Sequence, residues 1–344
     1  MNMKLIDLEA HFFTQSFLDY LRRNDEFPRI ETIRVDGVKK DKLMLHEQLW
    51  ALRHATMQAL MDVDEMRLAD MDANGVSMQA LTLAGPGCEL FRPEDAVPLV
   101  RDINDEAAEV VKRHPDRFFG LAALAPQNPE AAAGELERAV NKLGYRGAKV
   151  NSHFRGGEYF DEEKYWVILE TAAELDVPIY LHPRIPSPGM IQPYLKYGFR
   201  SAGAALGFAA DTSLAAMRLI YSGVFNRFPN LKIILGHLGE GLSFWLNRVN
   251  HLWDSEDGGF KLSLPHKPSE YIKNNFLVTT SGMHFLPAFI CTYMALGADS
   301  ILFAVDYPFE KTREAVHFVS NLEISDGDLH KICHANAERL FNLG

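Results

Sequence analysis

The chain has 344 residues, and 47% of them are hydrophobic, which is enough for one large core of the size found in α/β barrels. Its net charge of -11 argues against a nucleic-acid-binding surface, and no apolar run approaches the ~18 residues of a membrane helix. The three cysteines form no CxxC pair and no signal-peptide pattern precedes the first strand, so the sequence favours a reducing, cytoplasmic compartment.

Short apolar strands alternate with helical segments along most of the chain. Strands are predicted over 5–11, 76–83, 118–123, 147–151, 177–182, 231–236, 276–280 and 300–306. Helices are predicted over 62–74, 93–114, 130–143, 161–175, 201–225, 239–253, 285–296 and 311–341. Asp62 and Asp161 are the expected N-caps of the first and fourth helices. Residues 14–60 break the alternation, and we expect an insertion with some helix that forms a lid over the end of the first strand.

Nearly all-apolar strands, each followed by a helix, indicate a parallel sheet covered on both faces. About eight such units predict an α/β fold, a (β/α)8 TIM barrel with an N-terminal insertion after the first strand, in a single domain over 1–344. An open doubly wound sheet is the alternative. That fold would need a G-x-G-x-x-G loop after the first strand, and the stretch Gly85-Pro86-Gly87 does not match this pattern.

Polar side chains stand where the predicted strands end, and in a barrel these ends share one rim. Glu9 and His11 are two positions apart, so both can point the same way from the first strand. His182 and Asp306 end the fifth and eighth strands. Buried carboxylates and imidazoles are costly unless they are paired or bound to a metal. One divalent ion, Zn²⁺ or Mn²⁺, would satisfy these four residues. Taken alone, Glu9 and His11 could also be a solvated glutamate and a surface histidine at an ordinary strand end.

Longer motifs surround these residues. Tyr180-Leu181-His182-Pro183-Arg184, Gly236-His237-Leu238-Gly239-Glu240 and Asp306-Tyr307-Pro308-Phe309-Glu310 are the most specific. With them the chain resembles the amidohydrolase superfamily. The similarity is to its decarboxylase branch, which includes γ-resorcylate, 2,3-dihydroxybenzoate, 5-carboxyvanillate and aminocarboxymuconate semialdehyde decarboxylases.

This resemblance implies a role for each motif residue. Glu9, His11, His182 and Asp306 would hold one divalent metal, and no organic cofactor is implied. His237 would polarise or orient the substrate with Glu240 as its carboxylate partner, and Asp306 would protonate the ring carbon. Arg248 matches an arginine that reaches the neighbouring subunit's site, which implies a homodimer or homotetramer.

Further residues are candidates for contact with a small aromatic carboxylic acid. Arg184 could bind a carboxylate or pair with an acid at the rim, because its guanidinium fits carboxylates in a bidentate way. Phe208 and Phe309 could pack against an aromatic ring or belong to the core. Asn151 at the fourth strand's end and Arg53 in the insertion complete the expected set.

The leading functional hypothesis is non-oxidative, metal-dependent decarboxylation of an ortho-hydroxy aromatic carboxylic acid. The alternative within the superfamily is a hydrolase or hydratase that acts on a lactone or an unsaturated carboxylic acid. A metal-binding scaffold without turnover is the third possibility. Lys149 lies on the strand that carries a carboxylated lysine in two-metal relatives; we expect a structural role for it, and the two-metal arrangement stays open.

Overall fold

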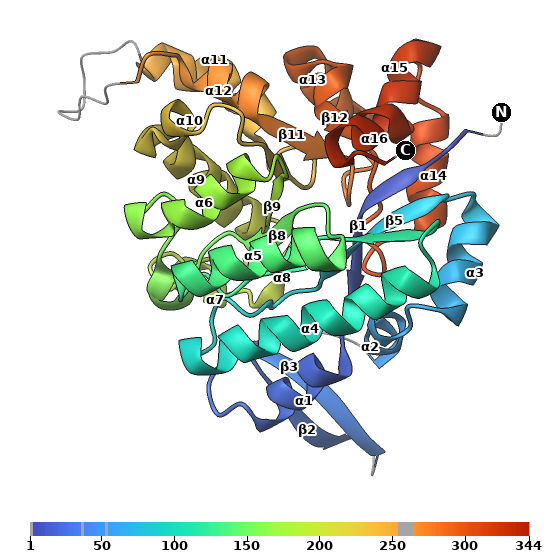
Figure 1. Ribbon diagram of the computed structural model, residues 1–344, viewed down its shortest axis with the longest axis vertical. Helices are drawn as coiled ribbons and strands as arrows, with labels where there is room; N and C mark the ends of the chain where they lie inside the picture. Colours follow the sequence, from blue (N-terminus) through green and yellow to red (C-terminus); the bar gives the residue numbers. More distant parts are fainter. Residues whose placement is uncertain (1–2, 36–37, 52–53, 254–263, 344) are drawn as a thin grey trace.

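A closed barrel of parallel strands forms the centre of the computed structural model, which describes residues 3–35, 38–51, 54–253 and 264–343 (Figure 1). In barrel order, its strands are β1 (Ile6–Phe12), β5 (Met78–Leu83), β6 (Phe118–Gly120) with β7 (Ala122–Ala123), β8 (Ala148–Asn151), β9 (Ile179–His182), β10 (Ile233–Leu235), β11 (Phe276–Thr279) and β12 (Ile301–Leu302). β6 and β7 share one barrel position, because β6 pairs with β5 and β7 pairs with β8. The amide of Leu8 donates to the carbonyl of Phe303 at 3.1 Å and closes the ring. The predicted barrel is confirmed.

Helices surround this barrel and cover the outward faces of its strands (Figure 1). They are α3 (Glu65–Asn74), α4 (Pro93–Arg113), α5 (Pro129–Leu143), α6 (Trp166–Glu174), α9 (Gly207–Ser222), α10 (Val224–Arg227), α11 (Leu242–Trp253), α12 (Pro268–Asn275), α13 (Leu286–Leu296), α14 (Thr312–Ser320), α15 (Asp326–His330) and α16 (Asn336–Phe341). The short helices α7 (Gln192–Leu195) and α8 (Phe199–Ala202) lie in the connection between β9 and α9. Single turns occur at η1 (Arg155–Gly157), η2 (Glu163–Tyr165), η3 (Ala298–Ser300) and η4 (Lys331–Ala335). No described helix has the length and apolar character to cross a bilayer.

Both expected N-caps are wrong. α3 begins at Glu65, and Asp62 precedes it while accepting a hydrogen bond from the amide of Met66 at 3.0 Å. α6 begins at Trp166, directly after the single turn η2, and Asp161 precedes both while its carboxylate pairs with Arg218 at 2.8 Å. β12 is also shorter than the expected 300–306, since the chain after Leu302 turns to meet β1 instead of continuing as a strand.

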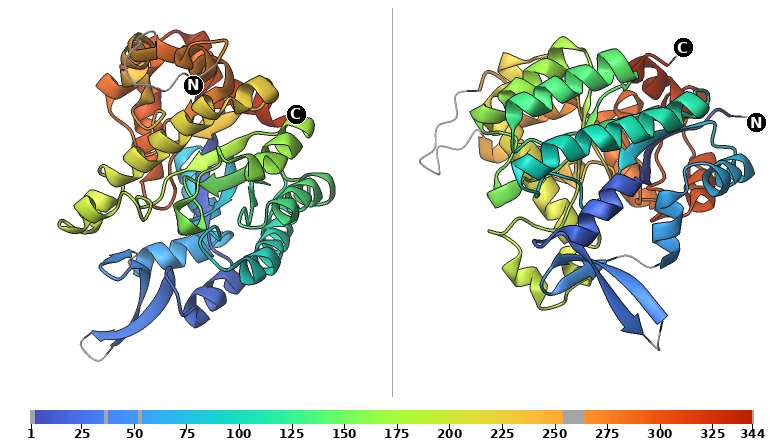
Figure 2. Two further views of the ribbon diagram at one scale, coloured as in Figure 1. Left: turned by 90° about the vertical axis from the view of Figure 1, so that its left-hand side faces the viewer. Right: turned by 60° about the horizontal axis from the view of Figure 1, so that its bottom comes forward.

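The insertion after β1 contains a small antiparallel sheet that the sequence did not predict. α1 (Gln15–Arg23) leads into β2 (Arg29–Val35), β3 (Val38–His46) and β4 (Leu49–Ala51), and α2 (His54–Met61) returns the chain to the barrel. The β2–β3 hairpin projects from the barrel in both views of Figure 2. Its residues are mostly half-buried or exposed, so its hydrophobic pattern lacks the alternation that marks a strand with one buried face.

Candidate active site

A β-bulge in β1 aims the first two site residues into the barrel. The pairing register between β1 and β5 shifts between Asp7 and Ala10. Leu8 therefore packs in the inner core beside Tyr180, while the next residue, Glu9, accepts a hydrogen bond from the Tyr180 hydroxyl. Bulges re-aim side chains in this way beside functional sites. Glu9 and His11 are both fully buried, so neither is the solvated surface residue that a simple strand end would give.

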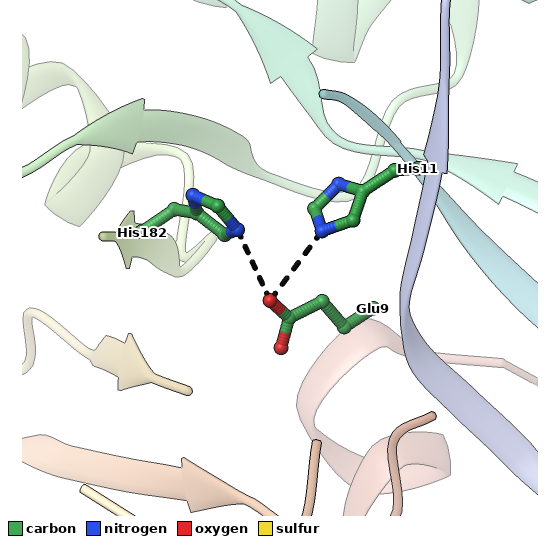
Figure 3. Close-up of side chains that lie close together, drawn as sticks. All are labelled: Glu9, His11 and His182. Carbon is green, nitrogen blue, oxygen red and sulfur yellow. Dashed lines mark ion pairs between the residues drawn. The ribbon is translucent and has the colours of Figure 1, made fainter. Parts of the chain in front are cut away.

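Glu9, His11 and His182 meet at the C-terminal end of the barrel strands (Figure 3). Each offers one ligand atom, and these atoms lie within 4.8 Å of one another. Glu9 Oε1 is 3.1 Å from His182 Nε2 and 3.5 Å from His11 Nε2. Glu9 Oε1 and His11 Nε2 are buried without a hydrogen-bond partner in the described chain, which is costly for polar atoms. A carboxylate with two imidazoles is a donor set that fits a divalent transition metal.

Neighbouring side chains fix the direction of each ligand. His11 Nδ1 lies 2.9 Å from the hydroxyl of Thr82, and His182 Nδ1 lies 3.2 Å from Asn151 Oδ1. With Nδ1 engaged as the donor, Nε2 of each ring presents its lone pair to the centre of the cluster. Metal-binding histidines are commonly oriented by such second contacts.

His237, Glu240 and Asp306 stand beside this cluster in strained backbone. All three have φ values between 51° and 74°, the left-handed region that non-glycine residues rarely adopt. His237 Nδ1 is 2.7 Å from Glu240 Oε1, and its Nε2 is 3.8 Å from Asp306 Oδ2. Asp306 Oδ1 is in turn 3.1 Å from His11 Nε2. Gly282 allows this approach, because a Cβ there would lie 3.1 Å from the His237 ring.

The charges of these groups follow from their surroundings. Burial opposes ionisation of Glu9, but the imidazoles of His11 and His182 hold its pKa well below the usual value. Burial lowers the pKa of His182 to about 3, and the positive charge of Lys149 adds to this effect. Burial also opposes the charge of His237, yet the Glu240 carboxylate keeps the His237 pKa well above its usual range. The site therefore combines an anionic carboxylate, a neutral imidazole ligand and an imidazolium.

A cavity of about 390 Å³ opens onto the cluster. Arg184, Phe208 and Phe309 line its wall together with His11, His182, His237 and Asp306. The Phe309 ring lies 5.5 Å from the His11 ring. Residues Pro28, Leu43, Leu45, Ala51 and Thr56 show that the insertion forms part of the same wall. The cavity has the size and the mainly apolar lining of a small-molecule site.

The remaining expected site residues lie elsewhere. Asn151 is fully buried behind His182, where its amide contacts Lys149 and Glu89 rather than the cavity. Arg248 is exposed on α11, apart from the cavity residues of its own chain. Arg53 lies outside the described residues. Arg184 makes no ion pair with any described residue; its Nη1 donates to the carbonyl of His153 at 3.1 Å.

Sequence reasoning missed several residues that support the cluster. Tyr180 is the clearest, because it stands two positions before His182 on the same strand, a spacing that places both side chains inside the barrel. Thr279 lies 3.5 Å from Glu9 Oε2 and also belongs to a predicted strand. Glu89 carried no recognisable signal, since it follows an irregular glycine-rich loop.

Comparisons with known proteins agree with this geometry. A family model described as amidohydrolase matches residues 6–343. A γ-resorcylate decarboxylase of Polaromonas sp. (strain JS666 / ATCC BAA-500) is 39% identical over 292 residues, 83% of this chain and 89% of that protein. The crystal structure of 5-carboxyvanillate decarboxylase from Sphingomonas paucimobilis has a TM-score of 0.88 at 35% identity, covering 99% of this chain and 100% of that one.

A further structure contains the metal itself. A dihydroxybenzoic acid decarboxylase from Polaromonas sp. JS666 was solved with bound manganese and the inhibitor 2-nitroresorcinol. Its TM-score is 0.85 at 35% identity, covering 99% of this chain and 97% of that one. The resemblance inferred from the motifs is thereby confirmed, as is the expectation of a divalent metal site.

Proposed function

Because the chain belongs to the amidohydrolase family, we propose that it decarboxylates an ortho-hydroxy aromatic carboxylic acid of the dihydroxybenzoate, γ-resorcylate or 5-carboxyvanillate type. The reaction is a non-oxidative carbon–carbon lyase reaction that consumes one proton and releases CO₂. The observation that carries the proposal is the buried Glu9–His11–His182 cluster at the end of an aromatic-lined cavity. Glu9 Oε1 and His11 Nε2 in this cluster have no hydrogen-bond partner among the described residues. The γ-resorcylate and 5-carboxyvanillate decarboxylases compared above act on aromatic acids.

Glu9, His11, His182 and Asp306 would hold one divalent ion, Mn²⁺ or Zn²⁺. When bound, such an ion supplies a Lewis-acidic anchor for the carboxylate and the adjacent phenolic oxygen of the substrate. His11 is placed for this role by Thr82, and His182 by Asn151. The bound manganese of a relative supports Mn²⁺ as the first metal to test.

The chain's own groups handle the proton. The carbon that bears the carboxylate must be protonated before the C–C bond breaks, because a bare aryl anion is too unstable to leave. Asp306 delivers this proton, and the imidazolium of His237 lies 3.8 Å from its second oxygen to support the transfer. Glu240 keeps His237 charged. When CO₂ departs, the ring regains its aromaticity.

Other side chains position the substrate. Phe208 and Phe309 pack against the aromatic ring, while Arg184 supplies a positive charge at the cavity wall. The 14–60 insertion lines the same cavity as part of a single domain. Arg53, outside the described residues, stays the proposed substrate contact from this insertion. Asn151 contributes through His182, because its amide is already engaged by Lys149 and Glu89.

A second copy of the chain completes the site in this proposal. Phe244 and Trp245 on α11 are 72% and 49% exposed, which is unusual for large apolar side chains on a free surface. Arg248 stands on the same helix, so a homodimer or homotetramer that covers α11 would carry Arg248 toward the neighbouring site. Three free cysteines fit a cytoplasmic enzyme.

A substrate panel tests the reaction. Protein loaded with Mn²⁺ is incubated with 2,6-dihydroxybenzoate, 2,3-dihydroxybenzoate and 5-carboxyvanillate, and CO₂ and the phenolic product are quantified. We expect turnover of at least one acid and its loss in Asp306→Asn. If all three acids stay intact while a lactone is opened or an unsaturated acid is hydrated, the proposed function is wrong and the hydrolase or hydratase alternative holds.

A further inference from the structure

We propose that Glu89, Asn151 and Lys149 form a buried relay that positions His182 and sets how strongly it binds the metal. The inference rests on the metal site of the proposed function and assigns positioning roles outside the ligand set. Each member is buried, and none of the three lines the cavity. Their contacts run in one direction, from the loop after β5 through the end of β8 to the metal-binding imidazole on β9.

Glu89 fixes the orientation of the Asn151 side chain. Its Oε1 accepts the backbone amide of Asn151 at 2.8 Å, and its Oε2 accepts Asn151 Nδ2 at 2.8 Å. The Nδ2 atom must therefore face Glu89, and Oδ1 must face the opposite way. Asn151 Oδ1 lies 3.2 Å from His182 Nδ1. This arrangement requires the proton of His182 on Nδ1 and leaves the lone pair of Nε2 for the metal.

The loop before Glu89 is shaped around this contact. Gly87 has φ +68°, and a Cβ at this position would lie 2.2 Å from both Asn151 Nδ2 and Glu89 Oε2. Only glycine allows the loop to approach so closely. The glycine-rich stretch over 85–87, which does not match a nucleotide-binding loop, has a local purpose in holding the relay.

Lys149 contacts Asn151 Oδ1, the same oxygen that faces His182. Its Nζ donates to Asn151 Oδ1 at 2.8 Å, and Lys149 is only 2% exposed. An amide oxygen that already accepts from an ammonium group is a weaker acceptor for a second donor. His182 consequently keeps less electron density than a histidine backed by a free carboxylate, and a metal bound to it remains more electrophilic. The buried ammonium also repels a divalent ion nearby.

The two halves of the relay therefore predict opposite effects on metal binding. Loss of Asn151 removes the acceptor that orients His182, so the affinity should fall by about 10–100-fold, the usual cost of losing such a partner. Loss of the Lys149 charge leaves Asn151 held by Glu89 and removes a cation near the metal, so the affinity should rise. A lysine that served only as packing would weaken binding when removed.

The experiment measures Mn²⁺ dissociation constants by competition with a chelating dye, without substrate. The variants are Asn151→Ala and Lys149→Met, with Lys142→Met on the exposed face of α5 as the control. We expect Asn151→Ala to bind Mn²⁺ more weakly than the wild type and Lys149→Met to bind it more tightly. The Lys142→Met control should bind Mn²⁺ as the wild type does. If Lys149→Met fails to fold, Lys149→Gln replaces it, since an amide can still donate to Asn151 without carrying charge, and it too should bind Mn²⁺ more tightly.

Weaker binding in the folded Lys149 variant, or an unchanged constant in Asn151→Ala, overturns the relay. The Mn²⁺ dissociation constants test the relay independently of any measurement of turnover. If the protein acts on none of the aromatic acids, the proposed function fails while the relay is still judged by metal affinity alone.

Discussion

Asp7 on the first barrel strand accepts a hydrogen bond from the backbone amide of Val305 at 2.9 Å, beyond the end of the last strand. The same carboxylate oxygen accepts the amide of Glu9 at 3.0 Å, and the other accepts Gln79 Nε2 at 3.0 Å. Asp7 thus links β1 to the segment that carries Asp306. The contact between β1 and the segment around Val305 forms a seam between the two ends of the chain. Glu9 and Asp306 lie on opposite sides of this seam, so the geometry of the seam determines the positions of these two expected metal ligands.

Asp7→Ala should destabilise the protein and weaken metal binding together. The substitution leaves the amides of Glu9 and Val305 buried without an acceptor, at a cost of roughly 1–3 kcal/mol each. Urea denaturation and Mn²⁺ competition measure the two effects. Asp116→Asn, at an exposed position, is the matched control and should change stability by no more than about 0.5 kcal/mol. Wild-type affinity in a destabilised Asp7→Ala protein would show that the seam does not position the ligands.

His11→Ala should reduce the affinity for Mn²⁺ strongly. Loss of a residue that only supports a ligand typically costs about 10–100-fold in metal affinity, and the loss in His11→Ala should be larger. The reason is that His11 Nε2 is buried, has no hydrogen-bond partner in the described chain and is directed at the cluster. Thr82→Val removes only the hydroxyl beside His11 Nδ1 and should fall in the 10–100-fold range. If metal content and decarboxylation both survive His11→Ala, Glu9 is a ligand without His11.

Glu240→Gln should move the alkaline limb of the pH–rate profile to lower pH. In the wild type, burial opposes the charge of His237 and the Glu240 carboxylate raises the His237 pKa. Without that carboxylate the His237 pKa falls, so the imidazolium is lost at a lower pH. The kcat/KM profile measures this limb. Glu137→Gln on the exposed side of α5 should leave it in place, and an unshifted profile in Glu240→Gln would remove His237 from the proton-handling group.

Asp211→Asn should make the protein less stable at neutral pH but not in acid. Asp211 accepts hydrogen bonds from His153, Tyr159 and the amide of Ser187 at 2.8, 2.8 and 3.0 Å. Burial raises the Asp211 pKa, yet the contact with His153 and the other donors bring it below 3.8. This stabilisation is present above pH ~4 and is lost as the pH falls through the folded-state pKa.

The free energy of unfolding at pH 7 should drop by roughly 1–3 kcal/mol in Asp211→Asn. The difference from the wild type should shrink as the pH is lowered below about 4, as followed by urea denaturation. A difference that stays constant over this range would mean that Asp211 is already protonated in the native protein.

The sequence predicted the barrel and the rim because both depend on local patterns. Apolar strands followed by helices indicate a closed parallel sheet, and the strand-end rule brings Glu9, His182 and Asp306 to one place from distances of more than a hundred residues. Strand periodicity alone predicted that the side chains of Glu9 and His11 point to the same face of the first strand. It could not reveal the bulge after Asp7 that turns them inward, because a bulge depends on pairing with β5.

The residues that support the cluster were harder to predict. Glu89 acts only through contacts across the fold with Asn151, and nothing in its local sequence distinguishes it from a solvated acid. The β2–β3 hairpin was missed because a largely exposed hairpin lacks a buried face and hence an alternating pattern. β12 ended early because the chain after Leu302 turns toward β1, where the carbonyl of Phe303 accepts the amide of Leu8, and local propensity does not foresee this contact.

Metal titration of the stripped protein tests the central claim most directly. CO₂ release from the best substrate of the panel is measured as Mn²⁺ is added to protein freed of metal by a chelator. We predict no turnover without metal, a linear rise, and a plateau at about one equivalent per chain, since Glu9, His11 and His182 form one centre. Full activity in the stripped protein, or a rise that continues to two equivalents, would contradict a single metal centre that drives the decarboxylation.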